Sequence, residues 1–179
     1  MKKLKFAPAL LLVLVLTSCS TVRVVSDYDR EANFDQYKTY AFYKPGVDKA
    51  EISDLDKKRI LRAIDAELSA KGLNKGESPD LLVSIFTKER ERVDVYNNNF
   101  GWGWGWNPWW YGGWGNTVST STEGSLYVDL IDAKTNELVW QGIGTARLIT
   151  SGNIDKKEER IREIVREIMM QYPPGSGQN

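Results

Sequence analysis

Two stretches of alternating apolar and polar residues, joined by a polar turn, form the most regular pattern in this 179-residue chain. In the first stretch Leu126, Val128 and Leu130 fall at every second position, which is typical of a strand with one buried face. Residues 132–137 are rich in turn formers, and a second strand is predicted from Leu138. One face of this second strand carries Leu138, Trp140, Gly142, Gly144 and Ala146. A large aromatic residue followed by small ones leaves a trough in which a helix can approach the sheet closely.

Two other segments have the 3.6-residue period of amphipathic helices. The first is predicted to begin after Ser53, which can cap it, and to end at Gly72 in a left-handed cap. Its apolar stripe consists of Ile60, Leu61, Ile64 and Leu68. The second helix is predicted from residue 153 or 155 to residue 172, and we expect it to lie in the trough of the second strand. Its apolar face consists of Ile161, Ile164, Val165, Ile168 and Tyr172.

Three further strands complete the predicted sheet. Residues 21–26 contain three valines, residues 37–43 are rich in aromatic side chains, and residues 81–86 are hydrophobic enough for a central strand. Lys44-Pro45-Gly46 is expected to end the second of these. The pattern predicts one α+β domain over residues 27–172, with an antiparallel sheet of about five strands and two helices packed on one face.

A solvated β-ribbon is predicted to project from the sheet, with residues 87–96 and 117–125 as its arms. Its tip is a Trp/Gly-rich insert, residues 97–116, which contains six of the seven tryptophans. The segment has too little regular pattern to form a core of its own, and indoles are costly to leave in water. The predicted binding side chains are Trp102, Trp104, Trp106, Trp109, Trp110, Tyr111 and Trp114.

Four interpretations of this tip stay open at the level of the sequence. Tryptophan is favoured at membrane–water interfaces because one end of the side chain is apolar and the other is polar. Aromatic faces also stack on the sugar rings of peptidoglycan or lipopolysaccharide, and tryptophan is enriched at the energetic centres of protein interfaces. The fourth interpretation is an inert loop that collapses onto its own sheet, in a domain that serves as a scaffold for an unknown partner.

The N-terminal segment indicates export and lipid attachment. Three lysines precede a short apolar run, which is typical of a signal peptide over residues 1–18 and too short for a permanent membrane span. Residues 16–19, Leu-Thr-Ser-Cys, resemble the lipobox of bacterial lipoproteins, so Cys19 is the expected site of acylation, palmitate included. The alternative is an ordinary secretory signal with an incidental cysteine. With Cys19 acylated, residues 19–26 are expected to form the acylated N-terminus and first strand, and residues 173–179 a flexible tail.

Charge and composition restrict the chemistry. Basic and acidic residues number 24 each, and loss of residues 1–18 leaves 21 against 24, a net charge of −3. This charge argues against a nucleic-acid partner and against attraction to anionic lipid surfaces. The chain has no histidine, and no metal site or cofactor is expected. The carboxylate pairs Glu89 with Glu91 and Asp129 with Asp132 could support a hydrolase, but we expect solvated strand and turn positions and no enzyme.

Four stretches of the chain carry a resemblance to a known family: DYDREANFDQYKTYAFY at 27–43, AKGL at 70–73, PDLLVSI at 79–85 and the hairpin at 124–146. With the final helix, they resemble the bacterial lipoprotein family catalogued as domain of unknown function 4136. The resemblance implies the architecture and a cell-envelope location, and it supplies no activity and no catalytic residues. Ser20, which is not aspartate, resembles the sorting signal for the outer membrane. We therefore expect a non-enzymatic lipoprotein that faces the periplasm and binds an envelope protein, a glycan or the membrane.

Overall fold

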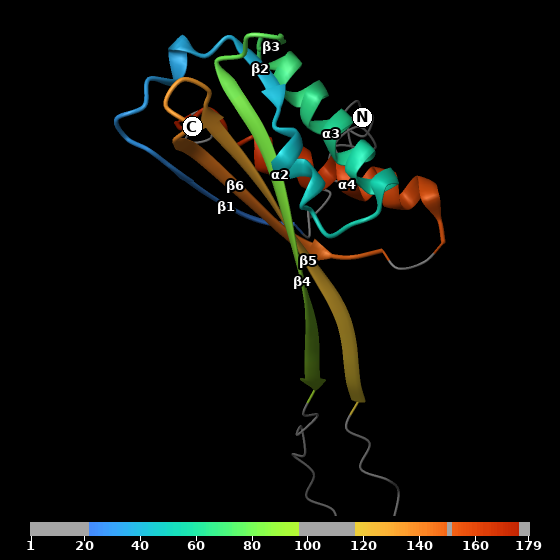
Figure 1. Cartoon of the computed structure of the whole chain (residues 1–179). Helices are drawn as coiled ribbons and strands as arrows, with labels where there is room; N and C mark the ends of the chain where they lie inside the picture. The colour runs from blue at the N-terminus through green and yellow to red at the C-terminus, as the bar shows by residue number, and fades with distance from the viewer. Residues whose placement is uncertain (1–21, 97–116, 150–151, 176–179) are drawn as a thin grey trace, which may run out of the picture.

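The computed structural model describes residues 22–96, 117–149 and 152–175 (Figure 1). A six-stranded sheet has the order β1-β6-β5-β4-β2-β3. Its strands are β1 (Arg23–Tyr28), β2 (Thr39–Phe42), β3 (Asn74–Lys75), β4 (Leu81–Tyr96), β5 (Thr117–Asp132) and β6 (Leu138–Arg147). The helices are the short α2 (Lys44–Asp48), α3 (Asp54–Ala70) and α4 (Ile154–Met169), with a 3-10 turn, η2 (Phe34–Gln36).

The α+β class is confirmed, but the sheet is mixed and not purely antiparallel. β4, β5, β6 and β1 pair antiparallel, whereas β2 is parallel to both β3 and β4. The reason is the connection between β2 and β4. Between β2 and β4 the chain passes through α3 and returns along the sheet. The strand β4 therefore runs in the same direction as β2.

The β5–β6 hairpin forms as predicted, apart from one residue. Trp140 and Ala146 are buried, but Leu138 is 49% exposed. A register shift at Leu130/Ile131 leaves Val139 as an extra residue in β6 and turns Leu138 to the other face. The prediction that Leu138 shares a face with Trp140 is therefore wrong, because sequence alternation alone does not reveal a β-bulge.

The helix α4 occupies the trough that the small residues of β6 leave. A Cβ atom added to Gly142 would lie 2.5 Å from the side chain of Ile168, and one added to Gly144 would lie 2.8 Å from it. Both distances are shorter than real contacts of a Cβ atom. The two glycines are thus the reason that α4 can pack against the sheet at this distance.

The helix α3 has the termini that the sequence predicts. The Ser53 hydroxyl accepts a hydrogen bond from the backbone N–H of Asp56, and Gly72 has a φ of 85°. The short helix α2 was not predicted, because Lys44-Pro45-Gly46 reads as a strand terminator. Pro45 instead lies in the first turn of α2, where its missing N–H costs nothing.

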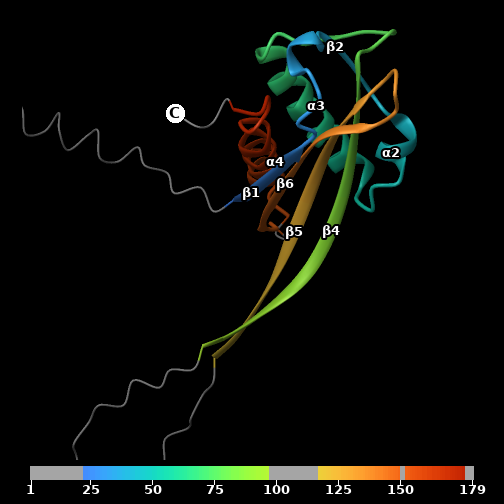
Figure 2. The same cartoon turned by 90° about the vertical axis from the view of Figure 1, so that its left-hand side faces the viewer.

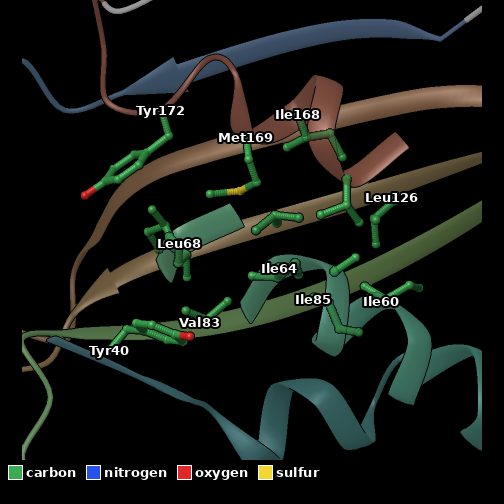
Figure 3. Packing of buried hydrophobic residues seen from close by; sticks show 14 of the residues in the cluster. Tyr40, Ile60, Ile64, Leu68, Val83, Ile85, Leu126, Ile168, Met169 and Tyr172 are labelled. Atoms are coloured by element: carbon green, nitrogen blue, oxygen red, sulfur yellow. The ribbon is translucent and has the colours of Figure 1, made fainter. Parts of the chain in front are cut away.

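The core lies between one face of the sheet and the two long helices (Figures 1 and 3). Ile64 and Leu68 of α3 and Ile168 and Met169 of α4 are fully buried against the sheet. Phe34 packs against this core, since its ring lies edge-on against Tyr37 and Tyr172. This packing confirms the prediction of two helices on one face.

The long strands β4 and β5 continue beyond the rest of the sheet as a two-stranded ribbon (Figures 1 and 2). Their pairing runs without interruption from Leu81↔Asp132 to Tyr96↔Thr117. The neighbouring strand β6 ends at Arg147, opposite Glu123. The arms of the predicted ribbon are therefore present, while the tip, residues 97–116, lies outside the described residues.

Candidate functional site

The side chains singled out in the sequence lie outside the described residues. This applies to Cys19 and to the seven aromatic residues of the tip, Trp102, Trp104, Trp106, Trp109, Trp110, Tyr111 and Trp114. The structure does describe the residues on either side of them. Val22 and Arg23 follow the anchor segment, and Tyr96 and Thr117 flank the tip.

The chain enters the sheet beside the base of the ribbon. Arg23, the first residue of β1, pairs with Thr145 of β6. Its guanidinium donates to both carboxylate oxygens of Glu123, at 3.0 and 3.1 Å. Glu123 is the point in β5 beyond which β6 no longer pairs. Because β1 and β5 are both antiparallel to β6, they run parallel to each other, and both enter the sheet body from the ribbon side.

A second feature of this end is an apolar cavity of about 620 Å³, here called the ribbon-base cavity. It lies where the first turns of α3 and α4 approach the base of the ribbon. Its apolar lining consists of Ile52, Leu55, Ile60, Leu126, Leu148, Ile149, Ile154, Ile161 and Ile164. Sequence reasoning missed this cavity because its walls come from five separate segments, each of which looks like ordinary core or helix cap.

Asp56 joins the two helices on the wall of this cavity. Its carboxylate accepts hydrogen bonds from Lys157 Nζ of α4 at 2.5 Å, from Arg59 Nη1 at 2.8 Å and from the Ser53 hydroxyl at 2.8 Å. Burial acts to raise the pKa of Asp56, but the hydrogen bonds from Lys157, Ser53 and Arg59 outweigh it and hold the pKa below its usual value. Asp56 is therefore charged at neutral pH and links α3 to α4.

We predict that Asp56→Asn lowers the free energy of unfolding by about 2 kcal/mol at pH 7, because three hydrogen bonds to a charged acceptor are weakened. A lowered native pKa stabilises the fold above the unfolded pKa of about 3.9, and this contribution disappears as pH falls through the native pKa. The difference between wild type and variant in urea unfolding should thus be largest at pH 7 and become smaller as the pH is lowered toward 2. The matched control is Asp54→Asn, whose side chain is 92% exposed. An equal loss in both variants would contradict the role of Asp56.

The carboxylate pairs considered for catalysis have separate partners. Asp129 accepts from Gln141 Nε2 at 2.8 Å, and burial raises the pKa of Asp129 although that hydrogen bond partly offsets it. Asp132 accepts from the Tyr37 hydroxyl at 2.9 Å and from the backbone N–H groups of the turn that follows. Burial acts to raise the pKa of Asp132, but these hydrogen bonds lower it overall. Asp129 and Asp132 thus have structural roles, and Asp132 is buried, so the expectation of a solvated turn position is wrong for it. Glu89 is exposed on the ribbon, as expected, and the side chain of Glu91 lies outside the described residues.

Comparison with known protein families identifies the domain. A family model described as a domain of unknown function (DUF4136) matches residues 24–174. The chain belongs to the DUF4136 family. The match runs from β1 to the residues just after α4, so it includes every described element of the domain. This is the lipoprotein family that the sequence resembles, and it suggests a membrane-anchored envelope protein. None of the curated proteins compared with this DUF4136 chain matches it.

Three solved structures are similar to this chain at low sequence identity, one of them with a TM-score above 0.5. A PDZ domain protein from Parabacteroides distasonis ATCC 8503 matches 86% of this chain with a TM-score of 0.52 and 21% identity. This chain spans only 36% of the length of that protein. The PelC dodecamer from Paraburkholderia phytofirmans has a TM-score of 0.46 at 14% identity, covering 83% of this chain and 94% of that one. A minor lipoprotein from Acinetobacter baumannii has 0.37 at 9%, covering 75% and 88%.

The described residues contain neither a membrane-spanning helix nor a metal-ligand cluster. No helix among them is long and apolar enough to cross a membrane. No group of three or more cysteine or acidic side chains in the described part of the DUF4136 domain could hold a metal ion. Two features of the described domain can be related to function. One is the end of the sheet at which β1 begins and the ribbon projects, and the other is the ribbon-base cavity.

Proposed function

We propose that this DUF4136 protein is a non-enzymatic lipoprotein, acylated at Cys19, that faces the periplasm from the outer membrane. Its Trp-rich segment, residues 97–116, contacts the membrane that holds the anchor. The observation that carries the proposal is the place where the chain enters the sheet. The residues that follow Cys19 and the base of the ribbon meet at one end of the sheet, where Arg23 binds Glu123.

Chain lengths support this arrangement. The four residues from Cys19 to Arg23 span at most about 14 Å when fully extended. The ribbon from Arg90 to Tyr96 advances about 20 Å beyond the end of β6, at about 3.4 Å per residue. Because β1 enters the sheet from the ribbon side, the described chain begins at the end of the sheet from which the ribbon projects. In our proposal, a ribbon longer than the tether then brings the segment between Tyr96 and Thr117 to the bilayer surface.

The composition of that segment favours contact with the boundary between lipid and water over electrostatic binding to lipid headgroups. The mature chain has a net charge of −3, so anionic lipid headgroups do not attract it. Six indoles between residues 102 and 114 instead offer side chains that favour the boundary between lipid and water. Stacking on a glycan, or contact with an envelope protein, would use the same indoles and is tested by the same experiment. An inert tip on a scaffold domain and, least supported, a carboxylate-dependent hydrolase are the alternatives.

We predict that deletion of residues 100–114 abolishes membrane binding and leaves the fold intact. The deletion brings Asn99 next to Gly115, a pair that suits a tight hairpin connection, and all core contacts lie elsewhere. The experiment uses the chain from residue 19 with Cys19→Ala, so that only the tip can bind. Outer-membrane vesicles should shift its tryptophan emission to the blue and sediment it, whereas the deleted chain should stay in the supernatant.

The control keeps the length of the tip and changes the six tryptophans to serine. If this variant binds vesicles as well as the intact tip does, the indoles are not the contact. A blue shift with peptidoglycan fragments, or retention of an envelope protein without any vesicle binding, would replace the membrane by a glycan or a partner. No shift and no retention with vesicles, peptidoglycan or envelope extract would leave the tip inert.

A further inference from the structure

The ribbon-base cavity is a hydrophobic opening at one end of the core. Ile60 of α3, Ile161 and Ile164 of α4 and Leu126 of β5 form its walls. Figure 3 places Ile60 and Leu126 at the end of the core opposite Tyr40 and Tyr172. Leu55 and Ile154, in the first turns of the two helices, line the same cavity and are each 62% exposed. Two large aliphatic side chains at the mouth of an apolar cavity indicate a ligand with a hydrocarbon part.

The size of the cavity favours one hydrocarbon chain over two. A methylene group takes about 30 Å³, close to the share of one water molecule in the liquid. A chain of 12 to 16 carbons then needs roughly 360 to 480 Å³ on the same basis. A cavity of about 620 Å³ accommodates one such chain. Two 16-carbon chains would need roughly 960 Å³ on that basis, so one chain matches the cavity better than two.

The charges around the cavity favour an anionic head group. Four cationic side chains line it, but Arg160 is paired with Glu163 and Lys88 is balanced by Glu89. Arg59 and Lys157 share the single charge of Asp56, which leaves one positive charge in excess at this cluster. The N-caps of α3 and α4, Ser53 and Asn153, also line the cavity, so the positive ends of two helix dipoles lie there, partly offset by Asp54 and Asp155 in the first turns. The mature chain is acidic as a whole, so this positive region is local.

We infer that the ribbon-base cavity binds one molecule of a free long-chain fatty acid. The alkyl chain lies between α3, α4 and β5, and the carboxylate lies at Arg59 and Lys157. This inference is independent of the anchor and of the tip, because every residue on which it depends belongs to the described domain.

The test titrates dodecanoate, below its aggregation concentration, into the chain from residue 19 with Cys19→Ala. Isothermal titration calorimetry should give one site per chain. Dodecyltrimethylammonium has the same chain and the opposite charge, and it should bind at least tenfold more weakly. No heat of binding with dodecanoate, or equal affinity for the two amphiphiles, would overturn the inference.

Two pairs of variants locate the site. Ile161→Trp fills the cavity and should weaken dodecanoate binding at least tenfold, whereas Ile143→Trp, on the opposite face of the sheet, should not change it. Lys157→Gln removes a charge at the cavity and should weaken dodecanoate several-fold without affecting the cationic amphiphile. Its neighbour Lys156 is exposed and does not line the cavity, so Lys156→Gln is the matched control. Unchanged binding in both Ile161→Trp and Lys157→Gln would place the ligand elsewhere.

A nitroxide-labelled stearate gives a readout that requires no variant. It should broaden the methyl resonances of Ile60, Leu126 and Ile164 and leave those of Leu138 sharp, since Leu138 is exposed on the other face. Broadening at Leu138 with sharp cavity methyls would contradict the assignment even if Ile161→Trp failed to fold. Neither measurement uses vesicles or residues 100–114, so a negative result here leaves the membrane proposal untouched.

Discussion

Gly144→Leu should destabilise the domain by about 3 kcal/mol or more, a large fraction of the roughly 5–15 kcal/mol that stabilises an ordinary domain. The first atom of the new side chain would lie 2.8 Å from Ile168 and 3.1 Å from Ile164, and three further carbon atoms must follow it. These isoleucines belong to the face of α4 that packs on the sheet, so the helix would have to move away. Urea unfolding followed by circular dichroism measures the loss.

Gly152→Leu is the matched control for this substitution. A Cβ atom at Gly152 would meet nothing within 4 Å, so the change should leave the unfolding midpoint nearly the same. Gly144→Ala should give an intermediate loss, because the flexible end of Ile168 can yield to a single methyl group. If Gly144→Leu unfolds at the wild-type urea concentration, α4 does not pack on this face of β6.

Cys19→Ala should make the protein removable from the outer-membrane fraction by an alkaline wash, which releases proteins that are held to a membrane by surface contacts alone. Each buried methylene of an acyl chain contributes about 0.8 kcal/mol, so two or more chains give an anchor that one weak surface contact does not replace. The variant should also lose labelling by a palmitate analogue in the cell. Cell fractionation and click detection of the label measure the two effects.

Ser20→Ala is the control for the lipobox prediction, since it changes the next residue and keeps the thiol. It should retain both the label and the outer-membrane fraction. A Cys19→Ala chain that still carries the label and stays with outer membranes after the alkaline wash would show that the cysteine is incidental and the segment an ordinary secretory signal.

Much of the fold follows from short-range patterns. The alternation in β5, the small residues of β6 and the caps of α3 and α4 each depend on residues close together in the chain. Asn153 caps α4 by accepting from the N–H of Lys156, which is a local signal of the same kind as Ser53 in α3. The match of the family model over residues 24–174 confirms the family resemblance.

The features that sequence reasoning missed depend on residues far apart in the chain. The parallel pairing of β2 with β4 depends on the path of α3 over the sheet, which no alternation in either strand encodes. The bulge that turns Leu138 outward arises from the pairing with β5. The ribbon-base cavity requires the first turns of α3 and α4 to meet, through Asp56 and Lys157, 101 positions apart. Local patterns thus predict elements, and long-range contacts determine where they meet.

The proximity of the tip to the anchor membrane is tested most directly by lipid-specific quenching of tryptophan fluorescence. The acylated protein is reconstituted into vesicles whose lipids carry bromine on their acyl chains, and the emission is compared with that in unbrominated vesicles. Strong quenching of the intact protein is expected, because six of its seven tryptophans lie in residues 97–116. The variant that lacks residues 100–114 retains only Trp140, which is fully buried under α4, and its emission should not change. Equal emission of the intact anchored protein in both kinds of vesicle would contradict the account, because the tip would then lie away from the bilayer.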